Sequence, residues 1–173
     1  DKKLKLNAKI FSGSNIKTKN NSFRKISFLD NRTILSIYPK TELNVVGDVH
    51  DRIIDKNIHL IKGFVYLDIV NQFAAKFVLT TPYSKLICAE CKFWVFSNNK
   101  NGDMFHIING SGEIITDEKT VKIVPDSTFI INNINLVDIV PTSQEHKEFI
   151  DLLNINANEF VVEDITNYLD NLE

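Results

Sequence analysis

The sequence predicts a mainly β protein, built from stacked short strands in a β-sandwich-like or β-helix-like roll and followed by two short C-terminal α-helices. Three observations predict this fold class. Runs in which apolar and polar residues alternate recur about every 8 to 12 residues. Asn, Asp, Gly and Pro residues, which favour turns, separate these runs. After Pro141 the apolar spacing changes from that of a strand to that of a helix.

Length and composition fit one domain with an appendage. The chain has 173 residues, and we predict an all-β domain at residues 1–140 and a helical appendage at 141–173. Apolar residues make up 43% of the chain and include 12 Phe, which is enough for a core. The net charge of −2 gives no electrostatic reason to expect nucleic acid or an anionic membrane as partner. No apolar run approaches the roughly 18 residues that a membrane-spanning helix needs.

The first strands are predicted from alternation and turn residues. Leu4–Ala8 alternates, and Phe23–Leu29 and Thr33–Tyr38 form a hairpin about Asp30-Asn31, since Asn and Asp tolerate the left-handed backbone of such turns. Pro39 ends the second strand because proline cannot donate to a ladder. Glu42–Val46 follows as the next strand.

The later strands are predicted in the same way, with Gly, Asn, Asp and Pro residues between them. The longest is Lys85–Phe96, and Asn98–Gly102 reads as a hairpin turn. The other predicted strands are Arg52–Ile54, Asn57–Ile61, Phe64–Ile69, Lys76–Thr80, Met104–Ile108, Glu113–Thr116, Thr120–Val124 and Thr128–Ile131.

Two helices are predicted after Pro141. Residues 142–145 read Thr-Ser-Gln-Glu, which is typical of a capping box at a helix N-terminus. A second helix carries apolar residues at helical spacing: Val161, Ile165, Tyr168, Leu169 and Leu172. We expect this amphipathic helix to pack on its own domain or to dock on a partner, so these five residues are the candidate partner-binding residues.

The chain has two cysteines, Cys88 and Cys91, too few for a disulfide scaffold. Without a second Cys pair or a His-x3-His, structural zinc is not expected. The flanking residues read as strand, and residues three apart in a strand point to opposite faces. We therefore favour ordinary packing, with one cysteine inside and one outside. The alternative is a local disulfide closed across a bulge in an oxidising compartment.

One segment resembles a catalytic motif. Residues 47–51 read Gly-Asp-Val-His-Asp, close to the GDxHG entry of metallophosphatases, in which Asp48 and His50 would bind metal. That chemistry needs further ligands to hold two ions about 4 Å apart, and no Asn-His-Glu follows. A polar turn explains the segment better, and a metal-dependent hydrolase remains a remote alternative.

Other catalytic arrangements find less support in the sequence. Glu113 and Asp117 flank a Gly-rich turn and could be imagined as a glycosidase pair, but carboxylates occur in most β turns. There is no Gly-x-Ser-x-Gly nucleophile motif and no phosphate-binding glycine loop before a helix. We therefore expect no catalytic residues, no metal ligands, no cofactor and no enzyme activity.

Several motifs occur in the order and spacing of one known family, and the chain resembles the FecR domain over about residues 8–131. The first motif resembles the pattern I-x-T…I-x-F-x-D…P-x-T-x-L, with Ile16, Thr18, Ile26, Phe28, Asp30, Thr33, Leu35, Ile37, Pro39, Thr41 and Leu43. Similar matches follow at Leu60–Val65, Phe77–Pro82, Cys88–Val95 and Ile108–Ile114. The main departure is Glu90-Cys91, where the family has Gly-Thr.

The resemblance implies a non-catalytic β module of the bacterial envelope. Such domains act outside the cytoplasm, as signal relays to a sigma factor or as modules of lipoproteins and surface assemblies. Because the chain begins with Asp1 and not Met, we expect that an N-terminal signal was removed and that the protein lies in the periplasm or at the cell surface. We expect protein partners, in a homo-oligomer or a larger assembly. A periplasmic sensor or relay role is the alternative, since this chain has no membrane helix or cytoplasmic segment before the β domain.

Overall fold

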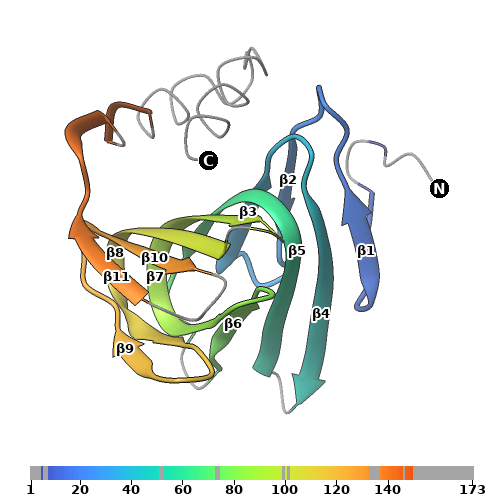
Figure 1. The fold of residues 1–173 in the computed structure, drawn as a ribbon. Coiled ribbons are helices and arrows are strands. Elements are labelled where there is room, and N and C mark those ends of the chain that lie inside the picture. Colours follow the sequence, from blue (N-terminus) through green and yellow to red (C-terminus); the bar gives the residue numbers. More distant parts are fainter. Residues whose placement is uncertain are drawn as a thin grey trace.

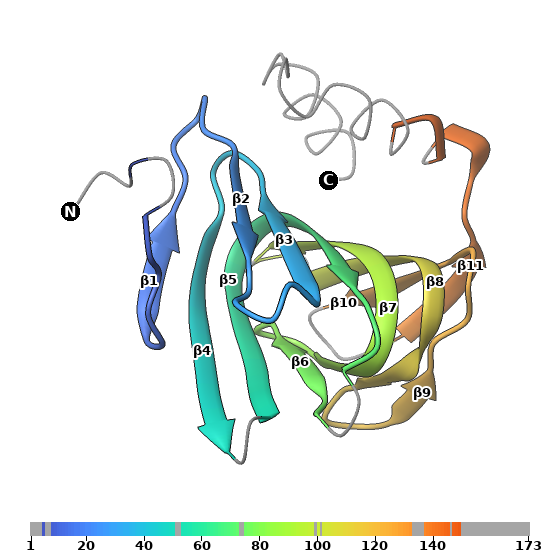
Figure 2. The same cartoon turned by 180° about the vertical axis from the view of Figure 1, so that it is seen from behind.

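The structure is a computed structural model that describes residues 5, 8–50, 53–72, 75–98, 100, 102–132, 137–145 and 147–149. Within these residues the fold is mainly β, as the sequence predicts (Figures 1 and 2). The strands are β1 (Ser14–Lys17), β2 (Arg24–Ser27), β3 (Thr33–Ile37), β4 (Glu42–His50), β5 (Ile53–Ile69), β6 (Phe77–Thr80), β7 (Lys85–Asn98), β8 (Gly102–Ile115), β9 (Thr120–Lys122), β10 (Ser127–Asn132) and β11 (Val137–Pro141). Residues 144–145 and 147–149 are helical.

All of these strands belong to one mixed sheet. Its main order is β1-β4-β5-β6-β7-β8-β10-β11, with β2 paired to β3, β3 to β5, and β9 to β8. The pairing of β5 with β6 is parallel, and the other pairings among the described strands are antiparallel. The fine arrangement is therefore a single curved sheet.

Three long strands, β5, β7 and β8, give the sheet its curvature. The first part of β5 pairs with β4 and β6, and its second part pairs with β3 and β7. The short strand β6 is thus inserted between β5 and β7 where these two strands separate (Figure 2). As a result β7, β8 and β10 run across the direction of β4, and the sheet encloses its own core (Figure 1).

A bulge in β5 marks the point where this strand changes neighbours. Glu42 pairs with Lys62 while Leu43 pairs with Leu60, so one residue of β5 is left over. Gly63 follows with φ of 108°, and a Cβ there would lie 2.4 Å from Oγ1 of Thr41. Glycine is required because no side chain fits so close to Thr41 and because other residues are strained at this φ.

The bulge also changes which side chains of β5 face the core. Before it, Ile58 and Leu60 are buried, and after it Val65, Leu67 and Ile69 are buried, so the inward set moves from even to odd positions. One extra residue has this effect because side chains alternate between the faces with a period of two. Buried residues from all the long strands form one cluster: Ile16, Leu35, Ile37, Leu43, Val45, Ile58, Leu60, Val65, Leu67, Ile69, Phe77, Leu79, Leu86, Cys88, Cys91, Phe93, Val95, Phe105, Ile107, Ile114, Ile123, Phe129, Ile131 and Val137.

The hairpin about Asp30-Asn31 is confirmed. β2 and β3 pair antiparallel, and Asn31 has φ of 54°, the left-handed conformation expected of that turn. Other boundaries differ from the prediction. Lys5 and Ala8, in the predicted first strand, lie outside any strand. The three strands predicted between Arg52 and Ile69 are one continuous strand from Ile53, because Gly63 forms a bulge where the sequence suggested a turn.

The C-terminal part differs further from the prediction. The last strand, β11, was not predicted, because its residues Asp138, Ile139 and Val140 are exposed and show no alternation. The β body thus continues to Pro141. The predicted first helix begins as expected, with Lys147 N donating to Ser143 O at 3.1 Å. The second helix, with Val161, Ile165, Tyr168, Leu169 and Leu172, lies outside the described residues, and the division at residue 140 stays a prediction.

The curved core predicts a large difference between two leucines. Leu67 is fully buried on β5, whereas Leu29 in the β2–β3 turn is 94% exposed. Leu67→Ala should lower the free energy of unfolding by about 2–5 kcal/mol, because it removes buried methyl groups and leaves a cavity. Leu29→Ala should change it by no more than about 0.5 kcal/mol. Urea unfolding monitored by circular dichroism measures both, and equal effects would contradict this placement of the core.

Candidate functional site

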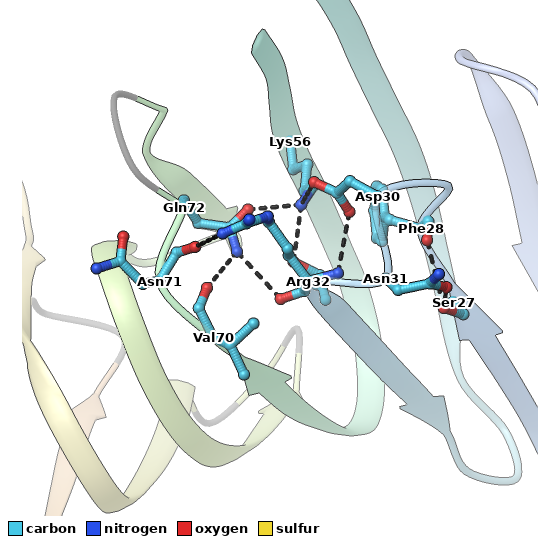
Figure 3. A network of polar contacts seen from close by, with 10 residues as sticks. Ser27, Phe28, Asp30, Asn31, Arg32, Lys56, Val70, Asn71 and Gln72 are labelled. Carbon is cyan, nitrogen blue, oxygen red and sulfur yellow. Dashed lines mark hydrogen bonds and ion pairs between the residues drawn. The ribbon is translucent and has the colours of Figure 1, made fainter. Parts of the chain in front are cut away.

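A fully buried lysine is the centre of the most connected polar cluster (Figure 3). Lys56 projects from β5 with 0% exposure. Its Nζ lies 2.6 Å from Oδ2 of Asp30, 3.1 Å from Oγ1 of Thr33 and 2.5 Å from Oε1 of Gln72. An ammonium group has three donors, so these three acceptors satisfy it completely. The Phe28 ring centroid lies 5.3 Å from the same nitrogen and adds a cation–π contact.

Gln72 joins the cluster to three other parts of the chain. Its Nε2 donates to Arg32 O at 3.0 Å and also to Val70 O, while its backbone N donates to Ala89 O at 3.1 Å. Arg32 in turn donates from Nη1 to Asn71 O at 2.6 Å. The β2–β3 turn, β5, the segment after β5 and β7 are therefore held together around one ammonium group.

The charge of Lys56 is matched by Asp30. Burial alone would raise the pKa of Asp30, but the hydrogen bonds from Lys56 and from backbone N–H groups, together with the charge of Lys56, hold this pKa below its ordinary value. The side chain of Asp30 is 23% exposed while that of Lys56 is fully enclosed. The arrangement is a closed ion pair, and its chemistry is that of a clamp between segments.

Sequence reasoning did not identify Lys56, although a signal was present. Lys56 lies two and four residues before Ile58 and Leu60, on the same side of β5 as these buried residues. A lysine in phase with core residues requires a buried partner. That the partner would be Asp30 depends on the tertiary structure, because the two residues come from separate hairpins.

The two cysteines form a disulfide in the structure, and both are buried. The favoured expectation of one cysteine inside and one outside does not agree with this. The physical reason is a bulge: Cys88 pairs with Gly112 and Glu90 with Ser111, so Ala89 is the extra residue of β7. This shift turns Cys91 to the same face as Cys88. The opposing residues, Gly110 and Gly112, lie so close that a Cβ at either would be 2.6 and 2.9 Å from the cysteine Cβ atoms.

A second polar cluster surrounds Asp103 at the start of β8. This carboxylate is 2% exposed and accepts hydrogen bonds from Ser84 Oγ at 2.6 Å, from Ser97 Oγ at 2.7 Å and from Thr81 Oγ1. Burial raises its pKa above the ordinary value of 3.8, and the three hydroxyl donors offset only part of this effect. Asp103 thereby ties the turn between β6 and β7 to the β7–β8 hairpin.

Aromatic rings gather on the face of the sheet opposite the core. We call Tyr38, Phe64, Tyr66, Trp94 and Phe96 the aromatic face. The ring centroid of Trp94 lies 4.7 Å from that of Tyr66, 5.0 Å from that of Phe64 and 5.3 Å from that of Tyr38. Burial, and then the neighbouring Tyr66, raise the pKa of Tyr38 above its ordinary value. Such ring pairs stabilise the sheet beyond the area that they bury.

The segment that resembles a metallophosphatase motif lies at the end of β4. Asp48 Oδ2 and His50 Nε2 are 2.9 Å apart, and their side chains are 66% and 67% exposed. Glu113 lies on β8, and Asp117 follows it in the turn before β9. Within the described part of the chain, no three metal-binding side chains gather at one place. No helix of that part is long and apolar enough to cross a membrane.

Comparison with known proteins shows the fold of this chain. No protein-family model matches it, and no curated protein matches it in sequence. Two crystal structures, at 1.65 and 2.50 Å resolution, of a protein described as a candidate anti-sigma factor from Parabacteroides distasonis are similar in structure. Their TM-scores are 0.63 and 0.62 at 15% and 14% sequence identity, over 73% of this chain. The chain spans 58% of the length of that protein, and the likeness is one of fold.

The Lys56 cluster predicts unequal effects for two Asp→Asn substitutions. Asp30→Asn keeps the shape of the side chain but leaves the buried ammonium without its counter-charge, and we expect a loss of about 3–5 kcal/mol in the free energy of unfolding. Asp48→Asn removes the same charge from the exposed pair with His50 and should cost at most about 1 kcal/mol. Chemical denaturation near neutral pH measures both. A loss for Asp30→Asn no larger than that for Asp48→Asn would show that Lys56 does not depend on Asp30.

The buried carboxylate of Asp103 predicts a pH dependence of known sign. Because its pKa is higher in the folded than in the unfolded chain, folding favours the protonated acid. Its stabilising contribution is present below the unfolded pKa and is lost as the pH rises through the folded pKa. The stability of Asp103→Asn relative to the unsubstituted protein should therefore increase from about pH 4 to about pH 7. Urea unfolding across this range measures the difference, with the exposed Glu118→Gln as control. A relative stability that stays flat or falls would refute the assignment.

Proposed function

We propose that this chain is a FecR-type domain of the bacterial envelope and that it acts as a non-catalytic protein-interaction module. The observation that carries the proposal is the agreement between two independent comparisons. The order of sequence motifs resembles the FecR domain, and the fold resembles that of a candidate anti-sigma factor. The glycine of one motif, Gly63, is also the glycine that β5 requires at its bulge.

The disulfide between Cys88 and Cys91 supports a place outside the cytoplasm. Disulfides persist in oxidising compartments such as the periplasm and are rare where thiols are kept reduced. Both cysteines are buried, and the bulge between them exposes the Ala89 carbonyl to Gln72 of the Lys56 cluster. The bond thus fits a protein that folds and functions in such a compartment.

The edge strand β11 is a suitable surface for a protein partner. It pairs with β10 on one side, and among the described strands none pairs with its other side. Ile139 and Val140 are 48% and 40% exposed on it. An edge of this kind can accept a strand from another protein through main-chain hydrogen bonds, with the exposed side chains giving specificity.

A role in a signal relay is the second candidate. It is favoured by the description of the similar Parabacteroides distasonis protein as a candidate anti-sigma factor. In such a role the domain would bind another envelope protein, and the occupancy of this contact would control a sigma factor. The module acting in a stand-alone assembly and the module acting in a relay use the same surface and differ in the consequence of binding.

The β11 surface predicts where a partner is captured. A photo-reactive residue in place of Ile139, in the complete protein in its bacterial host, should cross-link to one envelope protein. The same residue in place of Val124, which is 49% exposed but outside β11, should not. Mass spectrometry identifies the product. Cross-linking at Val124 alone, or at neither position, would refute β11 as the contact.

A reporter of sigma-factor-dependent transcription separates the two roles. Ile139→Asp should change the reporter signal if the domain belongs to a relay, while Val124→Asp should leave it unchanged. An unchanged signal in both variants, together with cross-linking at Ile139, leaves the assembly role and excludes the relay. Turnover of a small substrate that one polar substitution abolishes would overturn the non-catalytic assignment.

A further inference from the structure

The aromatic face is unusual for the outer side of a sheet. Tyr66 pairs with Trp94, and Phe64 pairs with Phe96, so these four rings lie side by side on β5 and β7. An antiparallel sheet with one solvated face normally carries polar residues there. Trp94 is 2% exposed, and its Nε1 finds no hydrogen-bond acceptor among the described residues. A surface of this composition fits an apolar segment that also brings an acceptor group.

The apolar character continues along the same face to the last strand. Phe96 pairs with Met104 on β8, and Met104 pairs with Ile130 on β10, which is 41% exposed. In the next row, Trp94 pairs with His106, and His106 pairs with Thr128. This second row leads from the aromatic face to the place where the chain leaves β11.

The chain after β11 is fastened to this face. Thr142 follows the strand, and its Oγ1 lies 2.8 Å from Nδ1 of His106 and 3.3 Å from Oγ1 of Thr128. Its backbone N donates to Asp126 O at 3.0 Å. Residues 144–145 and 147–149 are helical, and the ring centroid of Phe149 lies 6.4 Å from that of Phe64. The backbone therefore crosses from β10 and β8 to the aromatic face and arrives there at residue 149.

The residues that follow have the composition that this face requires. Residues 150–173 carry Val161, Ile165, Tyr168, Leu169 and Leu172 at helical spacing. The same 24 residues contain six carboxylates and no Lys, Arg or His. An amphipathic acidic segment thus begins directly at the edge of the aromatic face.

Basic residues border the aromatic face on the side of β2 and β5. Lys25 pairs with Ser36, and Ser36 pairs with Tyr66, so Lys25 lies in the same row as Tyr66 and Trp94. Lys62 lies two residues before Phe64 on the same side of β5. Both lysines are exposed. Their charge complements that of the acidic segment.

We propose that residues 150–173 dock on the aromatic face of their own chain, with the apolar side of a helix covering Trp94 and its neighbours. The face is then an intramolecular docking site, and the C-terminal segment is its occupant. A partner helix with the same apolar pattern can reach this face only by displacing the segment. The proposal does not depend on the envelope role, since it rests on the path of the chain and on the two complementary surfaces.

Trp94 is the only tryptophan of the chain and reports directly on this contact. Acrylamide quenching of its fluorescence should be weak in the full protein. In the variant with Ile165→Asp and Leu169→Asp, undocking should raise the quenching constant several-fold and shift the emission to longer wavelength. The control variant, Asn167→Asp with Asn171→Asp, adds the same charge on the other side of the predicted helix. It should quench like the unsubstituted protein.

Two outcomes would overturn the proposal. One is that the variant with Ile165→Asp and Leu169→Asp quenches like the control while circular dichroism shows the β body intact, because Trp94 would then be covered without the segment. The other is that quenching of the unsubstituted protein weakens as its concentration rises, because a second copy would then be the occupant.

A second variant tests the contact from the side of the sheet. Lys25→Glu with Lys62→Glu leaves the segment unchanged and should increase quenching at low salt, with a smaller increase at high salt, because charges screened by salt contribute less. Addition of a synthetic peptide of residues 150–173 to the Ile165→Asp and Leu169→Asp variant should restore weak quenching. Failure of the peptide to protect Trp94 at any concentration, together with no effect of the two lysine substitutions, would also refute the proposal.

Discussion

The bulges in β5, β7 and β8 are the constraint on which the rest of this structure depends. Each bulge adds one residue to a long strand and so exchanges its inward and outward side chains. A single strand can then line two parts of the core while it changes neighbours. Gly63 is required at the bulge of β5, and Gly110 faces the bulge of β7 with φ of 117°. Without these positions the sheet could not close over its core.

Polar clusters stabilise the places where this sheet divides. β6 is inserted between β5 and β7, so the segments on either side of it need other connections. Lys56 joins the β2–β3 turn to the segment after β5, and Gln72 extends this connection to the bulge of β7. Asp103 does the same for the turn after β6. Both charged groups are enclosed, which makes their hydrogen bonds costly to break.

The two faces of the sheet serve different purposes. The inner face holds the aliphatic core, and the outer face carries rings in place of the polar residues that water would favour. The edge strand β11 leads the chain back onto that outer face through Thr142 and Phe149. Strand edge and aromatic face are therefore neighbouring surfaces, and a protein that binds at β11 comes close to the site of the C-terminal segment.

Local residue patterns were sufficient to predict the mainly β fold and the hairpin about Asp30-Asn31. Alternation and the left-handed preference of Asn act over a few residues and can be read without knowledge of the rest of the chain. They also indicated the helical turn after Pro141. The continuous strand β5 and the last strand β11 were not predicted, because a bulge reads like a turn and an exposed edge strand needs no alternation.

The pairing of distant residues was decided by the tertiary structure. The bulge at Ala89 placed Cys91 on the same face as Cys88, although spacing indicated opposite faces. The partner of Lys56 was decided by the meeting of two hairpins, and the aromatic face by the register of β5 with β7. Strand periodicity determines which side a residue faces until an extra residue intervenes. Whether one does depends on how the whole sheet curves over its core.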